Sequence, residues 1–293
     1  MKYKSRGEKI FDVVNSIFMV FAMIVTLYPF LHVLVGSISD PLKLVGHRGL
    51  LFYPVGDIQF NAYQMVLDNE DFFTGYLNTL FYVVFGTSIS LVLTISLGYV
   101  LSRKNVMLNP LFTVIVVFPL FFSGGMIPTY LLYSDLNLID TRGAVLMAGL
   151  LSTTNIIIMR TAFKGVPESL DESARIDGAN DISILTKVML PLTMPTIAVQ
   201  ILFYGVARWN EWFSSFIYLR ERSKFPLQLI LREILIDSGT GDMAISWGGL
   251  AGVDYTDVIK YSSIIISIVP VLCVYPFLQK YFTKGVMIGA VKG

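Results

Sequence analysis

The polar and apolar residues of this chain do not alternate with the period of a surface helix or a surface strand. Apolar residues instead form blocks that are too long to be one face of an element in water, which is typical of segments in lipid. Each block is near the ~20 residues that a helix needs to cross a bilayer core. The six blocks are 13–38, 77–101, 110–133, 143–163, 194–218 and 261–282. The pattern predicts one all-α membrane domain, residues 1–293, with six transmembrane helices.

The first apolar block follows several basic residues between positions 2 and 9 and so resembles the start of a secretory signal peptide. The stretch from Val13 to Ser39 has no Asp, Glu, Lys or Arg. It is longer than the about 7–15 apolar residues of a signal peptide. No cleavage site of small residues follows it. We therefore expect this block to be retained as a membrane span.

The composition also indicates a membrane protein. Hydrophobic residues make up 54% of the chain and charged residues 15%, whereas an average soluble domain is about 25% charged. The single cysteine, Cys273, cannot form an intramolecular disulfide and is expected to be a packing residue. His32 and His47 have no cysteine or carboxylate at ligand spacing, so we expect no metal site.

The basic residues predict the orientation, because short cytoplasmic loops carry an excess of Lys and Arg. With the N-terminus inside, the inner segments contain Lys2, Lys4, Arg6, Lys9, Arg103, Lys104, Lys164, Arg175, Lys187, Lys280, Lys284 and Lys292. The outer segments, 39–76, 134–142 and 219–260, also contain acidic residues. Within the outer segment 219–260, the stretch 219–232 departs from the rule, because it contains Arg220, Arg222, Lys224 and Arg232. Because long translocated loops escape the rule, we still expect both termini in the cytoplasm.

Several predicted spans contain prolines, either within them or at their ends. These residues are Pro29, Pro119, Pro128, Pro195, Pro270 and Pro276. A proline inside a helix removes a backbone hydrogen bond and kinks the helix. Kinked helices are more typical of a bundle that changes conformation than of a static membrane anchor. The alternative is that prolines are simply commoner in membrane helices than in soluble ones.

The segment 164–191, between the fourth and fifth spans, is predicted to project into the cytoplasm. Pro167 suits the first turn of a helix, where Glu168 and Asp171 interact favourably with the helix dipole. Gly178 can adopt the left-handed conformation that ends such a helix. The segment therefore begins with a short helix and a sharp turn.

A second short helix is expected after this turn. Asp181 can cap it, and it can run through Leu190 until Pro191 precedes the fifth span. The two helices together form a projection that a soluble partner could use as a lever.

This loop resembles the "EAA" loop of bacterial ABC importer permeases, whose pattern is Glu-Ala-Ala, three residues, Gly, nine residues, Ile, one residue and Leu-Pro. The chain has Glu172, Ser173, Ala174, Gly178, Val188, Leu190 and Pro191 at these positions. It departs from the pattern at Ser173 and Val188, both small changes. The resemblance implies that the first helix docks on an ATP-binding subunit. The implied coupling residues are Asp171, Glu172, Ala174, Arg175, Gly178, Leu190 and Pro191. An ordinary amphipathic linker is the alternative.

Further residues resemble the carbohydrate branch of this family. They are the stretch 171–179, the sequence Trp209-Asn-Glu211, and the ending 285–293, which is similar to the tail of the smaller permease of maltose-type systems. The resemblance covers nearly the whole chain. It implies that the cytoplasmic tail, residues 283–293, reaches between the ATPase subunits, with Lys284, Gly289 and Lys292 as its candidate contacts.

The resemblance also implies the partners of the chain. A second homologous permease would complete the pathway in a heterodimer, and two copies of an ATP-binding subunit would lie at the cytoplasmic face. An extracytoplasmic solute-binding protein would deliver the ligand. The chain would lie among the lipids of a bacterial cytoplasmic membrane, with no nucleic-acid partner.

No motif for catalysis is present in the sequence. There is no phosphate-binding loop of the form Gly-x-x-x-x-Gly-Lys-Ser/Thr, and Gly239-Thr-Gly241 is too short to be one. Neither His-Glu-x-x-His nor Gly-x-Ser-x-Gly occurs. We therefore expect no enzyme activity, no catalytic residue and no bound cofactor in this chain, with ATP and Mg²⁺ used by the partner ATPase.

The fifth span carries charges, which are costly in a membrane and often functional. Arg208 and Glu211 flank Trp209 and Asn210, an arrangement that suits a sugar because the ring stacks on an aromatic side chain and the hydroxyls form hydrogen bonds. Asn78 in the second span could line the same path, as could Thr79 and Thr87. The alternative is an internal salt bridge with tryptophans at the outer interface.

Other functions are weighed against this interpretation. A secondary transporter would need buried carboxylates, and Glu211 is the only acidic residue deep in a predicted span. A receptor or scaffold would not need the cytoplasmic projection. An amino-acid or phosphate permease shares the loop and remains open. The residues do not identify the sugar, nor which permease holds the main binding site.

Overall fold

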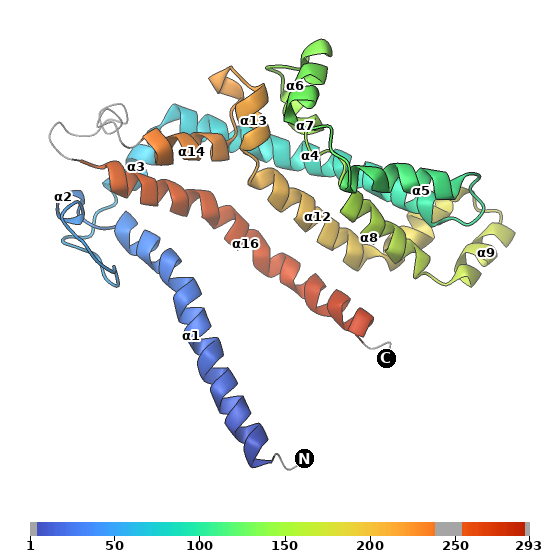
Figure 1. The fold of residues 1–293 in the computed structure, drawn as a ribbon, viewed down its shortest axis with the longest axis horizontal. Coiled ribbons are helices and arrows are strands. Elements are labelled where there is room, and N and C mark those ends of the chain that lie inside the picture. The colour runs from blue at the N-terminus through green and yellow to red at the C-terminus, as the bar shows by residue number, and fades with distance from the viewer. Residues whose placement is uncertain (1–4, 238–253, 291–293) are drawn as a thin grey trace. The chain divides into compact units, whose positions relative to one another are not determined.

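The structure, a computed structural model, describes residues 5–237 and 254–290, with the backbone alone for Tyr275 and residues 277–290. Every regular element in these ranges is a helix (Figure 1), which confirms the all-α prediction. The α-helices are α1 (Arg6–Ser37), α2 (Pro41–Leu44), α3 (Asn61–Asp68), α4 (Glu70–Ser102), α5 (Asn109–Val117), α6 (Met126–Asp135), α7 (Arg142–Met147), α8 (Thr153–Lys164), α9 (Glu168–Ile176), α10 (Asp181–Ile184), α11 (Leu190–Leu192), α12 (Met194–Trp209), α13 (Phe213–Tyr218), α14 (Leu227–Asp237) and α16 (Thr256–Ala290). Short 3-10 helices span Phe118–Leu120 and Arg222–Lys224, and a π-helix spans Leu185–Met189.

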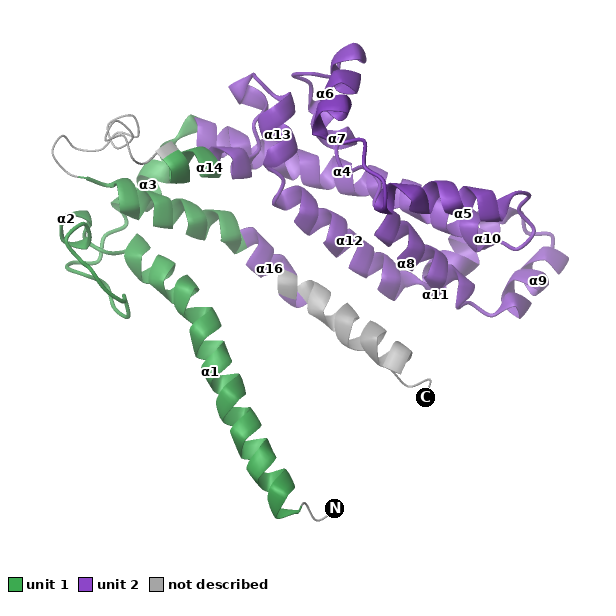
Figure 2. Cartoon of the chain, in the orientation of Figure 1, with its two compact units in different colours: residues 1–70, 231–269 green, residues 71–230, 270–293 purple. Residues whose placement is uncertain are grey.

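The chain divides into two compact units, coloured in Figure 2. Unit 1 contains Met1–Glu70 and Leu231–Val269, and unit 2 contains Asp71–Ile230 and Pro270–Gly293. Within unit 1, α1 passes close to α16 at Gly36, where an added Cβ would lie 2.6 Å from the Tyr261 ring. All candidate functional residues discussed below, apart from those of the predicted cytoplasmic tail, lie between α4 and α14 in unit 2.

Three of the described helices are long and apolar enough to cross a membrane: α1, α4 and the part of α16 from Thr256 to Val274. A fourth span is possible if the bent pair Asp181–Leu192 and Met194–Trp209, whose axes differ by 84°, counts as one. Most apolar side chains of α1 are exposed within this chain, as expected for a helix that faces lipid. The count of six spans stays a prediction.

Three of the six predicted blocks are interrupted rather than continuous. Block 110–133 breaks between α5 and α6, where Gly125 has φ +86°. Block 143–163 breaks between α7 and α8, where Gly149 has φ +64°. Block 194–218 breaks between α12 and α13. Both glycines have a positive φ, which other residues adopt only with a steric penalty, so the chain can change direction at these points.

The prolines act differently from one another. Pro29, Pro270 and Pro276 lie inside helices, as the kink interpretation requires. Pro128 and Pro195 lie in the first turn of α6 and α12, so kinks at these two positions were wrongly expected. A first-turn proline removes no intrahelical hydrogen bond, because the first N–H groups of a helix have no partner inside it.

A buried cluster joins α4, α8 and α12 to the segment that follows α9. Its members are Tyr99, Met159, Phe163, Ile184, Met189 and Ile197, with Ala174, Ala179 and Leu190 packed against it. At Gly98 an added Cβ would lie 3.0 Å from the Met159 Cβ, so α4 and α8 approach closely. The cluster gives the projecting loop a fixed base, which we call the loop base.

Candidate functional site

Gly178 ends α9 in the left-handed conformation that the sequence predicted, with φ +81°. The Ala179 N–H donates to the Ala174 carbonyl at 2.9 Å, and the Gly178 N–H donates to the Arg175 carbonyl at 3.0 Å. These two bonds form a Schellman motif, the common glycine-dependent end of a helix. Ala174 and Ala179 also pack against the loop base. The turn is therefore fixed by hydrogen bonds and by packing together.

The second helix of the loop differs from its prediction in two ways. Asn180 is the capping residue, and its side-chain oxygen accepts the Ser183 N–H at 2.8 Å, so the expected cap at Asp181 is wrong. Asp181 is the first helical residue, and its carboxylate binds Arg175 instead. The predicted run to Leu190 is divided into α10, the π-helix and α11. Leu190 packs on the loop base, and Pro191 lies in α11 just before the 84° bend.

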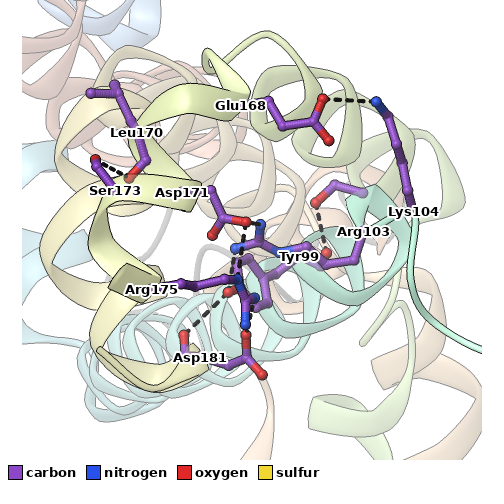
Figure 3. A network of polar contacts seen from close by, with 10 residues as sticks. Tyr99, Arg103, Lys104, Glu168, Leu170, Asp171, Ser173, Arg175 and Asp181 are labelled. Atoms are coloured by element: carbon purple, nitrogen blue, oxygen red, sulfur yellow. Dashed lines mark hydrogen bonds and ion pairs between the residues drawn. The ribbon is translucent and has the colours of Figure 1, made fainter. Parts of the chain in front are cut away.

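A network of charged side chains links α9 to the end of α4 (Figure 3). Arg103 Nη1 lies 2.8 Å from Asp171 Oδ2, with the two side chains only 16% and 15% exposed. Arg103 also donates to the Tyr99 hydroxyl and lies over the Tyr99 ring, 4.2 Å from its centroid. The Tyr99 hydroxyl donates in turn to the Asp181 backbone carbonyl at 3.2 Å. This network therefore joins α4, α9 and α10 around Arg103, whose side chain is mostly buried.

Arg175 completes the network on the side of the turn. Its Nε lies 3.3 Å from Asp171 Oδ2, and its Nη2 lies 2.5 Å from Asp181 Oδ1. The hydrogen bond to Asp181 is the main reason why the pKa of Arg175 is raised. Glu172 is not part of this network: it is exposed, and within the described residues it forms no hydrogen bond or ion pair. Glu172 is thus open to a partner protein.

A second ion pair lies at the start of α9. Lys104 Nζ lies 2.8 Å from Glu168 Oε2, but both side chains are mostly exposed. The hydrogen bond that Lys104 donates to Glu168 raises the pKa of Lys104. Exposed pairs contribute only about 0–1 kcal/mol, so Arg103 and Asp171 hold α9 more strongly than this pair does.

A cavity of about 830 Å³ lies between the end of α4 and the loop, lined by Tyr99, Arg103, Asp171 and Arg175 among others. Arg103 Nε and Asp171 Oδ1 are buried and have no protein partner in the described part of the chain. The cavity is lined by several charged side chains and is large enough for water to satisfy both atoms. Arg103 and Tyr99 were missed as site residues in the sequence, where Arg103 served only to predict orientation. The sequence signal that could have identified Arg103 was its place as a basic residue at the cytoplasmic end of a predicted span, with an acidic helix predicted on the same side.

The candidate pathway residues are brought together only in part. Asn78 is buried in α4, and its amide nitrogen donates to the carbonyls of Ser223 at 2.8 Å and Phe225 at 3.1 Å. Its amide oxygen accepts from Arg142 Nη2 at 2.9 Å. Asn78 therefore connects the segment after α13 to α4, and both its amide nitrogen and its amide oxygen form hydrogen bonds within the chain.

The charges of the fifth block do not pair as the alternative interpretation expected. Arg208 is 5% exposed and donates to the carbonyls of Val145 at 2.7 Å and Leu146 at 2.8 Å. Glu211 accepts the Ser214 N–H at 2.7 Å and so caps the start of α13. The reason is geometric, because the break after α12 turns Glu211 toward the next helix.

Trp209 and Asn210 have different surroundings, although they are adjacent in the sequence. Trp209 is buried, with its ring edge-on to Tyr76 at a centroid distance of 5.8 Å. Asn210 is exposed and lines a cavity of about 610 Å³ with Ser152, Asn155 and other residues of α8 and α12. The cavity-lining polar residues of α8 were not predicted, since nothing in the local sequence places α8 beside α12.

The residues of the predicted tail can be located only in part. Lys284 and Gly289 lie in the helical backbone of α16, and Lys292 lies outside the described residues. Cys273, expected to be a packing residue, is exposed in this chain.

Comparisons with known proteins place this chain among transport proteins. Residues 90–215, which include the loop, match the model of a family described as the binding-protein-dependent transport system inner membrane component. The polygalacturonan/rhamnogalacturonan transport system permease protein YtcP of Bacillus subtilis is 36% identical over 98% of this chain and 99% of its own length. The arabinooligosaccharides transport system permease protein AraQ of the same species is 26% identical over 97% of each.

Solved structures agree with these relatives. A chain from the crystal structure of a bacterial ABC transporter involved in the import of the acidic polysaccharide alginate has a TM-score of 0.89 and 36% identity. It covers 96% of this chain and 100% of its own length. A second chain, from an alginate ABC transporter in complex with a periplasmic protein bound to an alginate pentasaccharide, has a TM-score of 0.57 at 16% identity. This second likeness concerns the fold alone.

Proposed function

Because this chain belongs to the family of binding-protein-dependent transport system inner membrane components, and is the permease subunit of an ATP-driven carbohydrate importer, we propose that residues 164–191 couple its helices to a separate ATPase. The chain is a transport component and not an enzyme by itself. The observation that carries the proposal is the rigid base and exposed outer face of the loop. Ile176 is 86% exposed and Ile182 is 73% exposed, as apolar residues at a docking surface are.

The rest of the assembly follows from the same family. The chain forms half of a translocation pathway with a second, homologous permease, and two copies of the ATPase bind ATP and Mg²⁺ at the cytoplasmic face. An extracytoplasmic solute-binding protein delivers the sugar. When the ATPase pair closes, α9 moves and the network around Arg103 transmits the movement to α4. Glu172, which is exposed and forms no hydrogen bond or ion pair within the described residues, meets a basic residue of the ATPase.

The pathway itself is proposed to run along α12. Asn210 is the pathway candidate that lines a cavity, together with Ser152 and Asn155. Trp209, Arg208, Glu211 and Asn78, the other candidates, take part by shaping the walls, since each has partners within the chain.

Cysteine labelling will test the orientation. In a Cys273→Ser background, Tyr53→Cys should react with a membrane-impermeant maleimide added outside intact cells, because position 53 is 75% exposed in the predicted outer segment. Ile182→Cys, 73% exposed, should react only after permeabilisation. The reverse pattern would overturn the orientation and with it the cytoplasmic role of the loop.

The substrate class is proposed to be oligosaccharides that carry carboxylates. A relative and a solved neighbour, each 36% identical to this chain over nearly its whole length, belong to systems for polygalacturonan/rhamnogalacturonan and for alginate. The arabinooligosaccharide relative would instead favour neutral sugars, but at 26% identity it is less similar to this chain than the other two are.

Uptake competition will test the substrate class. Cells that express the full transporter should take up labelled oligogalacturonate in an ATP-dependent manner. Unlabelled oligomers with free carboxylates should compete at least tenfold better than methyl-esterified oligomers of the same length, because only the charge differs between them. Equal competition by the esters would contradict the acidic class. Uptake that follows an ion gradient and not ATP would contradict the importer itself.

A further inference from the structure

The segment from residue 218 to residue 227, here called the outer segment, connects α13 to α14 and is fixed at both ends. At one end Tyr218 and Leu219 are buried. At the other end Leu227 is buried and donates its backbone N–H to the Thr79 hydroxyl at 2.8 Å. The residues between these anchors include the basic side chains that depart from the expected charge distribution.

The middle of the outer segment converges on one carboxylate, Asp140, from the link between α6 and α7. Asp140 Oδ1 accepts the backbone N–H groups of Arg220 and Glu221, each at 3.0 Å. The Asp140 N–H donates to the Tyr218 carbonyl at 2.7 Å, and Lys224 Nζ donates to the Asp140 carbonyl at 2.7 Å. Asp140 therefore holds the first half of the segment through its side chain and its backbone, while Asn78 and Thr79 hold the second half.

Asp140 adopts an uncommon conformation to do this. Its φ is +59°, in the left-handed region that non-glycine residues seldom occupy. The surrounding structure must stabilise such a residue, and left-handed residues of this kind cluster at functional sites. The backbone N–H groups of Glu221 and Arg220 also lower the pKa of Asp140, so it remains ionised at neutral pH.

The segment held in this way presents four consecutive exposed residues, Arg220, Glu221, Arg222 and Ser223. Arg222 Nε lies 2.5 Å from Asp71 Oδ2, and Lys224 Nζ lies 2.7 Å from Glu221 Oε2. Arg220 also has an exposed cation, and its guanidinium forms no ion pair with a carboxylate among the described residues. A fixed surface with one free guanidinium is complementary to an acidic partner.

We propose that Asp140 is a positioning residue that holds the outer segment in the shape in which Arg220 meets an acidic surface of the solute-binding protein. The inference rests on the proposed function, which places this segment on the outer face and names that protein as a partner. A surface that is already ordered binds more tightly, because less conformational freedom is lost on association.

Two substitutions at position 140 separate the carboxylate from the backbone conformation. Asp140→Gly keeps the left-handed conformation but removes the oxygen that accepts both N–H groups. Asp140→Asn tolerates the same conformation and retains an accepting oxygen. If the oxygen positions the segment, the glycine variant should be impaired and the asparagine variant should not.

The test uses the complete transporter in proteoliposomes, with the cognate binding protein added outside. For Asp140→Gly we expect the binding-protein concentration that half-maximally stimulates ATP hydrolysis to rise at least fivefold, with the maximal rate within twofold of the wild type. Asp140→Asn should stay within twofold in both quantities. Lys224→Gln, which removes only the lysine's contacts, should raise the half-maximal concentration twofold to threefold.

Trypsin provides a second readout that does not depend on transport. Added outside, it should cut after Arg220 or Arg222 at least fivefold faster in Asp140→Gly than in the wild type or Asp140→Asn. Identical stimulation and cleavage in all variants would overturn the positioning role, and so would equal losses in the glycine and asparagine variants. A wild-type complex that the binding protein does not stimulate would contradict the proposed function instead, and the trypsin comparison would still decide the role of Asp140.

Discussion

A valine in place of Gly178 will lower ATP-dependent sugar transport roughly fivefold to thirtyfold while the membrane helices still insert normally. The space around Gly178 is open, because an added Cβ would meet no atom within 4 Å. The cost is therefore conformational: a φ of +81° costs a residue with a β-carbon about 1–2 kcal/mol. At 1.4 kcal/mol for each factor of ten, the population of the correctly turned loop falls by the stated amount.

The matched control is Gly178→Asn, since asparagine tolerates the left-handed conformation and often ends helices there. It should retain at least half of the wild-type transport. Both variants should be measured in purified complex for bound ATPase and for sugar molecules transported per ATP hydrolysed. Normal transport in the valine variant, with the ATPase bound normally, would refute a coupling role for this turn.

Asp171→Asn is expected to have a still larger effect, on the order of a tenfold to hundredfold loss of transport. The substitution leaves Arg103 half-buried, without the carboxylate that lies 2.8 Å away. Removing one partner of a buried ion pair costs about 3–5 kcal/mol. The residual exposure of about 15% places this pair at or below the lower end of that range. The cost falls on the position of α9 against α4, so fewer sugars should be transported per ATP.

Two further variants decide whether the pair itself is responsible. Adding Arg103→Gln to Asp171→Asn removes the unpaired charge, so the double variant should recover at least fivefold over the single one, as a coupled pair requires. Lys104→Gln breaks the exposed pair with Glu168 and should change transport less than twofold, since such pairs contribute about 0–1 kcal/mol. A double variant that transports no better than Asp171→Asn would show that the unpaired charge of Arg103 is not the cause of the loss.

Local requirements explain which features of the site could be predicted from the sequence. Gly178 was predictable because a left-handed turn needs glycine whatever surrounds it. The cap of the next helix was ambiguous locally, because Asn180 and Asp181 are adjacent and both residue types cap helices well. In the structure the carboxylate of Asp181 binds Arg175, and Asn180 caps the start of α10.

Contacts between distant residues could not be predicted in this way. The spacing of Arg208 and Glu211 suggests an ion pair, yet Arg208 binds the carbonyls of Val145 and Leu146. Nothing in the local sequence places α7 beside α12, so these acceptors are found only in the fold. Asp140 is the strongest case, because its partners lie about 80 positions later in the chain.

The sequence by itself determined that this protein is helical, lies in a membrane and carries a helix–turn–helix loop of an importer permease. The first two depend on the lengths of apolar runs, and the third depends on the resemblance of residues 172–191 to the loop pattern of that family. All three are properties of short stretches of sequence. Only the tertiary structure decided which charges meet. The network around Arg103 and the contacts of Asp140 join segments far apart in sequence, and the free energy of such contacts depends on burial and distance, which the folded chain alone provides.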